Sequence, residues 1–538
     1  RLLSAMTTLP PREAIPQAQL APAGPAPTTR NSVLNSTGMP KIFFRYGGEC
    51  KTCRVSLYSR DHIEGSLVKV AMVYPRWQWH EYNGLAEPLG VLHLVSALRN
   101  AGHEPVFLDY SPCTSITELD HLARGCSLVG VAISAAAKMG RATDVLQHLR
   151  SVVPEAHFMV GGAYPSIFPE ICARGTGADS AMVGEGEETV VELADTLERK
   201  GDWKSLKNMA FPEGDRFVEN PRRPVVKNLD TIPYPARDVV DYDWYLANGM
   251  SEFGMVTTRG CPFHCIYCKP STDLIFGGGI RLRSAENVVG EAVGLAELRK
   301  TRHLRVFFKD DTITMHPVSW FEEFRDRLAG AGVRLEWHCN SRVDTVTRNK
   351  IRVMRESGCH CISFGVESGS QKILDCYRKG TTPEQAMSAF RWCHDFGVEA
   401  TANIMIGYPL ETNDDVEATY RLLKKLKPDD IIVYLSTAIP GRHIHTWAKE
   451  QGYLTTDENP ELLDPARNRA HEIMNMRLPF MDLSDVVGWK HKIEKYRSFR
   501  KVTSLNNIVR WASELAREPG KAMGKAGRVL RGFQGQGD

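Results

Sequence analysis

Three cysteines in one short segment of the chain have the types and spacing of a metal or cluster site. Cys261, Cys265 and Cys268 follow one another at intervals of four and three residues. A structural zinc site is normally closed by four ligands, and a four-iron cluster also normally takes four cysteines. Three thiolates would leave one iron with an open position for a ligand and for one-electron chemistry. A zinc site that borrows His264 or a distant ligand is the alternative that the spacing leaves open.

The position of the three cysteines favours the cluster. They follow a predicted strand at 255–258, and helices separate it from further apolar strands predicted at 304–308, 333–338, 361–366, 400–406 and 431–435. Six βα units with one hand of crossover form a partial barrel, whose ligand chemistry lies at the C-terminal ends of the strands. Ser284 is predicted to cap one of the helices, and Thr382 with Pro383 to start another.

A second alternation of strands and helices precedes the barrel. Its predicted strands lie at 68–74, 105–108, 128–133, 158–160 and 181–183, and Gly102 is predicted to end the first helix. The predicted fold class is therefore α/β, with a doubly wound, Rossmann-like domain, a partial (β/α)6 barrel and a small helical C-terminal region. The predicted boundaries are 1–66 for a disordered extension, 67–200 for the doubly wound domain, 201–250 for a proline-rich linker, 251–456 for the barrel and 457–538 for the helical region.

Composition restricts the classes of function. The net charge of +3 over 538 residues implies neither a nucleic-acid partner nor an anionic membrane surface. The longest uncharged apolar stretch, Leu128 to Ala137, is far shorter than the roughly 20 residues of a spanning helix. With no secretory signal and 13 cysteines, the chain is predicted to be cytoplasmic and reduced. Cys50 and Cys53 are interpreted as two unpaired thiols in the extension.

The segment from Cys261 to Cys268 resembles the cysteine loop of the radical S-adenosylmethionine superfamily, and the likeness runs from about 254 to 450. The resemblance implies that the three cysteines ligate a [4Fe–4S] cluster whose open iron binds the amino and carboxylate groups of S-adenosylmethionine. It implies that reduction cleaves the sulfonium and yields a 5′-deoxyadenosyl radical. An external one-electron reductant, such as flavodoxin or ferredoxin, is then required.

Segments at the later strand ends are similar to the cofactor motifs of the same family. They include Lys309-Asp310-Asp311, Ser341 to Asp344, Gly365 to Ser370 and Ile404 to Pro409, with Asn403 where a glycine is more usual. The family places the adenine, ribose, amino and carboxylate groups against these strand ends. The resemblance therefore assigns S-adenosylmethionine to Tyr267, Asp310, Asp311, Arg342, Glu367, Ile406 and Gly407.

Residues 67–200 resemble the cobalamin-binding domain that precedes the radical domain in one large branch of the superfamily. The matching pieces assign cobalamin to Pro88, Gly90, Ser134, Gly161, Gly162, Gly184, Glu185 and Gly186. The Asp-x-His-x-x-Gly sequence of many cobalamin domains is absent, which implies a cobalt without a histidine as its lower ligand. A doubly wound scaffold without a corrin is the alternative.

Together these likenesses predict a cobalamin-dependent radical enzyme, a methyltransferase that acts on an unactivated carbon of a small-molecule substrate. A cyclase or rearranging enzyme of the same branch is one alternative, and a non-catalytic zinc-binding protein is another. Residues 457–538 are predicted to close over the substrate. His443 and His445, after the last barrel strand, either face the substrate or lie in a surface loop.

Overall fold

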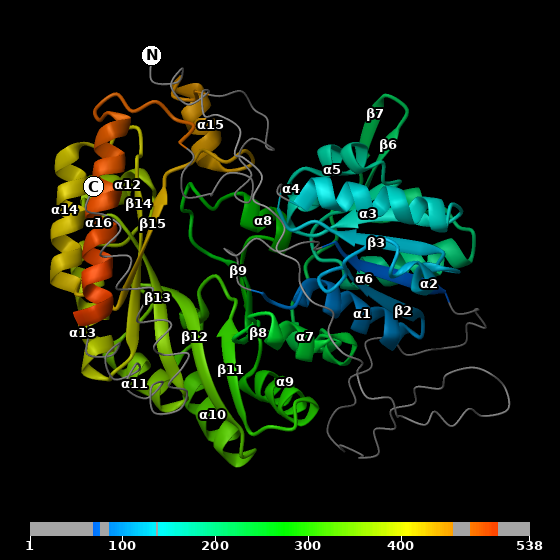
Figure 1. The fold of residues 1–538 in the computed structure, drawn as a ribbon, viewed down its shortest axis with the longest axis horizontal. Helices are drawn as coiled ribbons and strands as arrows, with labels where there is room; N and C mark the ends of the chain where they lie inside the picture. Colours follow the sequence, from blue (N-terminus) through cyan, green and yellow to red (C-terminus); the bar gives the residue numbers. More distant parts are fainter. Residues whose placement is uncertain (1–67, 76–84, 136–137, 456–473, 504–538) are drawn as a thin grey trace, which may run out of the picture. The chain divides into compact units, whose positions relative to one another are not determined.

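The computed structural model describes residues 68–75, 85–135, 138–455 and 474–503, which form two mainly parallel sheets with their helices (Figure 1). The predicted extension, with Cys50 and Cys53, lies outside the described residues. Within the described ranges, no helix combines the length and apolar character needed to cross a membrane.

The first sheet has seven strands in the order β2-β1-β3-β4-β5-β6-β7. Strands β1 to β5 pair in parallel, and their order 2-1-3-4-5 is that of a doubly wound sheet with a switch point between β1 and β3. The bounds are β1 (Lys69–Tyr74), β2 (Glu104–Asp109), β3 (Leu128–Ala132), β4 (His157–Gly161), β5 (Ser180–Met182), β6 (Met209–Glu213) and β7 (Arg216–Glu219).

Helices cover both faces of this sheet because its central strands are apolar on both sides. Val70 and Met72 of β1 join one core, and Ala71 and Val73 join the other. Gly102 ends the first helix in the left-handed conformation, as predicted. The first core includes α1 (Leu89–Ala101) and α6 (Glu187–Glu198), and the second includes α3 (Met139–Val152) and α5 (Pro169–Thr176), with α2 (Asp120–Ala123) and α4 (Ala163–Ile167) as short helices between strands.

Residues 201–250 are not a linker throughout, and this corrects the prediction made from their prolines. Strand β6 pairs antiparallel with β5, and the chain turns at Gly214 into β7. These two strands extend the first sheet at its β5 edge. The short helix α7 (Tyr242–Ala247) then leads to the second sheet.

The second sheet consists of six parallel strands in the order β15-β14-β13-β12-β11-β8 (Figure 1). Its edge strands do not pair with each other, so it is the predicted partial barrel. Ser284 and Thr382 cap α9 and α13 as predicted. The bounds are β8 (Phe253–Met255), β11 (His303–Phe308), β12 (Arg334–Arg342), β13 (Cys359–Glu367), β14 (Glu399–Ile406), β15 (Asp430–Leu435), α9 (Ala285–Leu298), α10 (Val318–Gly330), α11 (Arg348–Glu356), α12 (Gln371–Cys376), α13 (Pro383–Asp395) and α14 (Asn413–Leu426).

The strand predicted at 255–258 is broken, which corrects the sequence interpretation. Strand β8 ends at Met255, and β9 (Thr258–Cys261) pairs instead with β10 (Gly279–Leu282) in a separate antiparallel ribbon. The short helix α8 (Ser271–Phe276) lies between β9 and β10 along the chain. The break occurs because a carboxylate oxygen of Asp310 accepts hydrogen bonds from the backbone N–H groups of Thr257 and Thr258. Those N–H groups are then lost to the sheet.

The C-terminal helix packs on the outside of the barrel. In the described part of residues 457–538, α16 (Leu483–Thr503) lies beside α14 and contacts β15 (Figure 1). Arg497 of α16 pairs with Asp430 of β15 at 2.6 Å. The apolar side of α16 is buried because Val486 and Ile493 join the barrel core. The prediction that this region closes over the substrate is therefore wrong for α16.

Candidate functional site

Cys261 ends β9, and the other two cysteines of the triad lie on the tight loop that follows. Cys265 is buried, Cys261 is half-buried and Cys268 is exposed. The backbone N–H groups of Cys268 and Lys269 both donate to the carbonyl of Cys265 at 3.0 Å, so one hydrogen-bonded turn holds the last two cysteines together. Gly260 enters this loop at φ +85°, where a Cβ would come within 2.5 Å of the Gly279 carbonyl oxygen.

The loop is held from two sides. The buried Lys269 donates from Nζ to the carbonyl of Cys261 at 2.7 Å. From α15 (His443–Glu450), the N–H of His443 donates to Lys269 at 2.6 Å and that of Ile444 donates to Ile266 at 3.0 Å. His443 therefore meets the cysteine loop through its backbone, while its side chain is exposed.

The spread of the three sulfurs fits a cluster better than a zinc ion. In tetrahedral zinc sites the sulfurs lie about 2.3 Å from the ion, so they come within about 4 Å of one another. Among the described residues, the cysteine triad is not one of the groups whose ligand atoms all lie within 4.8 Å of each other. His264, the residue that a zinc site would borrow, is exposed. The wider spacing of the three sulfurs suits a four-iron cluster, in which each thiolate binds a different iron.

A cavity of about 510 Å³, here called the cysteine cavity, opens beside the loop. It lies at the C-terminal ends of the barrel strands, as predicted. Seven of the ten residues predicted for the cluster and S-adenosylmethionine line it: Cys261, Cys265, Cys268, Tyr267, Asp311, Arg342 and Glu367. Asp310, Ile406 and Gly407 do not.

A buried ion pair forms one wall of the cysteine cavity. Lys379 Nζ lies 2.8 Å from Glu367 Oε1, and the Tyr267 hydroxyl donates to the same oxygen at 3.0 Å. Burial and the neighbouring Glu367 carboxylate raise the pKa of Tyr267 well above its ordinary value. Gly365 leaves room for this group, because a Cβ there would come within 2.7 Å of both partners. Sequence reasoning missed Lys379, since it comes from the loop after α12.

Arg342 connects this wall to the cysteine loop. Its guanidinium pairs with Asp344, donates to the Lys379 carbonyl at 2.6 Å and lies over the ring of Phe263 at 3.6 Å. Its Nη1 is 3.5 Å from the sulfur of Cys265. The side chain is buried, so its positive charge acts on that sulfur with little screening by water.

Asp310 lies behind the turn that leads to the cysteines and does not line the cysteine cavity. Its Oδ1 accepts from Thr257, from both the N–H at 2.8 Å and the hydroxyl at 3.0 Å, and it borders the second cavity described below. Burial raises the pKa of Asp310 to about 6, and the hydrogen bonds from Thr258 and Thr257 only partly oppose this. Asp310 therefore fixes the turn between β8 and β9 that leads to the cysteines.

Ile406 and Gly407 are near the cysteine cavity but behind its surface. Because strand side chains alternate, Asn403 and Met405 of β14 line the cavity and Ile406 lies in the barrel core. Gly407 turns the chain at φ +88° and donates its N–H to Glu411 at 2.6 Å. The alternation in the sequence is the signal that would have assigned Met405.

A second cavity of about 530 Å³, here called the glycine cavity, lies at the C-terminal ends of β1, β3, β4 and β5. This is the edge at which doubly wound sheets bind ligands, next to the switch point. The structure brings all eight residues predicted for cobalamin to this one cavity: Pro88, Gly90, Ser134, Gly161, Gly162, Gly184, Glu185 and Gly186. Tyr74, His93 and Lys138 also line it and were not predicted.

The glycine cavity can admit a large flat group because several of the strand ends that line it carry glycines, which contribute no side chain. Gly162 has φ +111° and ψ −166°, a conformation that is essentially restricted to glycine. A Cβ at Gly162 would lie 2.8 Å from the carbonyl oxygen of Ile133, the residue that follows β3. His93, the one histidine of the lining, has its Nδ1 2.9 Å from the Pro233 carbonyl, and burial lowers its pKa to about 4.

The two cavities adjoin, because Asp311 lines both. Buried ion pairs join the elements around them. Arg259 of β9 forms an ion pair with Glu185 at 2.9 Å and another with Glu187, and both glutamates follow β5 of the first sheet. A second pairing, here called the Arg237 junction, has Arg237 2.8 Å from Glu87 and 2.6 Å from Glu291 of α9.

Comparison with known proteins identifies the two halves. Residues 255–423 match the model of the radical SAM superfamily, and residues 80–194 match that of the B12 binding domain. Over 374 residues the chain is 31% identical to a Pyrococcus horikoshii protein named as an uncharacterized methyltransferase, covering 69% of this chain and 80% of that one. The chain belongs to the cobalamin-dependent radical S-adenosylmethionine enzymes. Its cofactors are a [4Fe–4S] cluster, S-adenosylmethionine and cobalamin.

Other relatives of this radical enzyme carry different names. The hopanoid C-3 methylase of Methylococcus capsulatus is 25% identical over 402 residues, with 73% of each chain covered. The anaerobic magnesium-protoporphyrin IX monomethyl ester cyclase of Cereibacter sphaeroides is also 25% identical, over 67% of this chain and 60% of that one. Methylation and cyclisation therefore both occur among the names of its relatives.

Solved structures share the fold of this radical enzyme. The methyltransferase TsrM from Kitasatospora setae, with cobalamin and a [4Fe–4S] cluster bound, gives a TM-score of 0.63 at 19% identity, over 75% of this chain and 80% of that one. The cobalamin-dependent enzyme OxsB gives 0.62 at 17% identity, over 80% and 67%. Family membership and the spread of the sulfurs together exclude the non-catalytic zinc-binding alternative.

Proposed function

We propose that this radical enzyme transfers a methyl group from S-adenosylmethionine, by way of cobalamin, to an unactivated carbon of a small-molecule substrate. The observation that carries the proposal is the shared wall at Asp311, because it lets a substrate meet groups held in both cavities. The relatives named as methyltransferase and methylase support the reaction type.

In this proposal Cys261, Cys265 and Cys268 ligate the cluster. The bound cofactors supply one-electron cleavage of a sulfonium and a transferable methyl group. The chain fixes where this happens: Lys269 holds the carbonyl of Cys261, and Arg342 places a positive charge beside Cys265. The electron comes from an external carrier such as flavodoxin or ferredoxin.

The wall of polar side chains in the cysteine cavity binds S-adenosylmethionine. Asp311 and Glu367 are carboxylates suited to its amino and hydroxyl groups, and Asn403 supplies an amide. Lys379 holds Glu367 in place and keeps its charge balanced away from water. Met405, one inward position after Asn403 on β14, offers an apolar surface to the adenine.

The glycine cavity binds cobalamin through backbone contacts. Without Cβ atoms at Gly161, Gly162, Gly184 and Gly186, the strand ends can approach a corrin closely. Excluding water between the two cavities protects reactive species from side reactions.

Labelled S-adenosylmethionine tests the proposal. Protein reconstituted anaerobically with iron, sulfide and cobalamin is given S-adenosylmethionine with a CD3 methyl group, a reductant and a mixed small-molecule extract. We expect 5′-deoxyadenosine, label in the corrin fraction and one extract compound that gains a CD3 group. Formation of 5′-deoxyadenosine with label in neither the corrin nor any product would reject methylation and favour a cyclase or rearranging activity, as in the named cyclase relative.

A further inference from the structure

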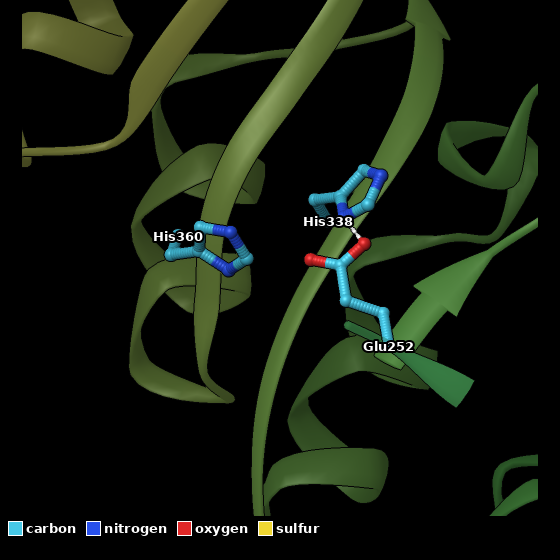
Figure 2. Close-up of side chains that lie close together, drawn as sticks. All are labelled: Glu252, His338 and His360. Atoms are coloured by element: carbon cyan, nitrogen blue, oxygen red, sulfur yellow. Dashed lines mark ion pairs between the residues drawn. The ribbon is translucent and has the colours of Figure 1, made fainter. Parts of the chain in front are cut away.

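A second group of possible metal ligands lies inside the barrel, closer to the N-terminal ends of the strands than the cysteine cavity. Glu252 directly precedes β8, His338 lies in β12 and His360 lies in β13. Figure 2 shows the carboxylate of Glu252 directed towards the two imidazoles. One ligand atom from each side chain lies within 4.8 Å of the others, and His338 Nδ1 is 3.2 Å from Glu252 Oε2. Within the described part of the chain, no other group of three or more His, Cys, Asp or Glu residues meets this distance.

The sheet geometry explains how the three side chains meet. Trp337 and Cys339 are fully buried in the layer between the sheet and its helices. Because strand side chains alternate, His338 between them points to the opposite face, the inside of the barrel. The register between β12 and β13 shifts here, because Trp337 pairs with Cys359 and His338 with Cys361. His360 is the extra residue of this bulge, and bulges redirect side chains next to sites.

The donor chemistry suits a cation. Side chains of Glu252 and His338 keep 19% and 22% of their surface exposed, so water and ions reach them. His360 Nδ1 is buried and has no hydrogen-bond partner among the described residues. An imidazole nitrogen without a partner and a carboxylate oxygen beside a second imidazole are donors that suit a divalent cation.

Neighbouring charges leave the position open to a cation. Arg305 of β11 approaches Glu252 only to 3.9 Å and lies closer to Glu336, at 3.4 Å. It is 48% exposed, so water screens it and the side chain can turn away. The flat ring of Phe307 stacks on His338 at 4.2 Å and fixes the orientation of the imidazole.

We infer that Glu252, His338 and His360 form a binding site for one divalent transition metal ion. Two imidazoles and one carboxylate are a donor set for Zn²⁺, with the fourth position left to water. The bound ion would join β8, an edge strand of the sheet, to β12 and β13 in its middle. This site is separate from the cysteine triad, and it does not depend on the proposed methyl transfer.

Zinc content measured on the cluster-loaded full chain tests the inference, because the cluster then occupies Cys261, Cys265 and Cys268. Wild-type protein, His360→Ala and His338→Asn are dialysed against Zn²⁺, desalted and analysed for zinc and iron. We expect both variants to bind one zinc fewer per chain than wild type, with unchanged iron. His303→Ala is the matched control, because His303 is the first residue of β11, is 58% exposed and is not one of the three proposed zinc ligands.

A zinc absorption-edge spectrum identifies the ligands of the zinc that the variants lose. The difference between wild type and His360→Ala should show only nitrogen and oxygen neighbours at about 2.0–2.2 Å. Thermal melting adds a second measurement, since Zn²⁺ should raise the Tm of wild type and His303→Ala more than that of His360→Ala. Equal zinc content in all four proteins, or sulfur neighbours in the difference, would overturn the inference.

Discussion

The glycine cavity and the cysteine cavity lie at equivalent edges of two parallel sheets, yet they differ in what the strand ends contribute. Seven residues that line the glycine cavity are glycines, whereas Gly365 is the one glycine in the lining of the cysteine cavity. Charged side chains line both cavities, but in the cysteine cavity Arg342, Lys379 and Glu367 form one connected group beside the cysteines. We expect a large flat ring to be accommodated where side chains are left out, and a small charged cofactor to be bound where side chains converge. Substitutions that remove a side chain should therefore impair the cysteine cavity most, and substitutions that add a side chain should impair the glycine cavity most.

The largest effect is expected from Cys265→Ala, which removes a side chain from the cysteine cavity. Iron should fall from about four per chain to near zero, with loss of S-adenosylmethionine cleavage, because two thiolates do not hold a four-iron cluster. Cobalamin content should stay unchanged if the two cavities bind independently. Iron and cobalt analysis after anaerobic reconstitution measures both. Cys376→Ala in α12 is the control, and iron retained in Cys265→Ala would contradict the ligand assignment.

Lys379→Met should be next in size. It leaves the Glu367 carboxylate buried without its cation, which costs about 3–5 kcal/mol when a buried pair is broken. We expect a lower Tm and at least about tenfold weaker binding of S-adenosylmethionine to cluster-loaded protein. Calorimetry and equilibrium dialysis measure these. Adding Glu367→Gln should recover much of the Tm but not the affinity, and if affinity returns too, Glu367 does not contact the cofactor.

Gly162→Ala adds a side chain to the glycine cavity. The backbone strain is about 1–3 kcal/mol, and the new Cβ would press on the Ile133 carbonyl. Cobalamin bound per chain should fall while the iron content stays constant. Gly140→Ala in α3 is the matched control, because a Cβ there meets nothing within 4 Å. If both variants keep full cobalamin, the rim does not depend on its glycines.

An effect no larger than that at Gly162 concerns Asp310, which belongs to the barrel but borders the glycine cavity. Its folded-state pKa of about 6 exceeds the ordinary value of 3.8. Between these values the folded protein keeps a proton that the unfolded chain releases, so stability falls as pH rises from about 4 to 6, by roughly 3 kcal/mol at most. Melting curves over this range should decline less steeply in Asp310→Asn. Asp414 is exposed, so Asp414→Asn should keep the wild-type slope of Tm against pH. Equal slopes in wild type and both variants would refute the role of Asp310.

Local signals in the sequence were sufficient for most of the fold and for much of the candidate site. The cysteine spacing, the apolar strands and the caps at Ser284 and Thr382 each depend on residues close together in the chain. Lys379 could not be predicted this way, because its meeting with Glu367 depends on how the loop after α12 returns to β13. The strand break at Thr257 likewise depends on Asp310, which is distant in sequence.

One error came from weighting the wrong local signal, and one assignment gains a neighbour when side-chain alternation is considered. Prolines suggested a linker at 201–250, although apolar residues on either side of Gly214 mark the hairpin of β6 and β7. Similarity to a family motif suggested Ile406, which stays a prediction, and strand alternation adds Met405, whose side chain lines the cavity while that of Ile406 lies in the core. In both segments side-chain periodicity shows where the side chains point, which composition and motif do not.

The Arg237 junction has a consequence for how the molecule comes apart. Arg237 is fully enclosed, with Glu87 on one side and Glu291 and the Gly254 carbonyl on the other. Pulling the doubly wound half from the barrel would strand a guanidinium and at least one carboxylate in an apolar setting, which is strongly unfavourable. The two halves should therefore melt in a single cooperative transition, and a protease should find no early cut between them.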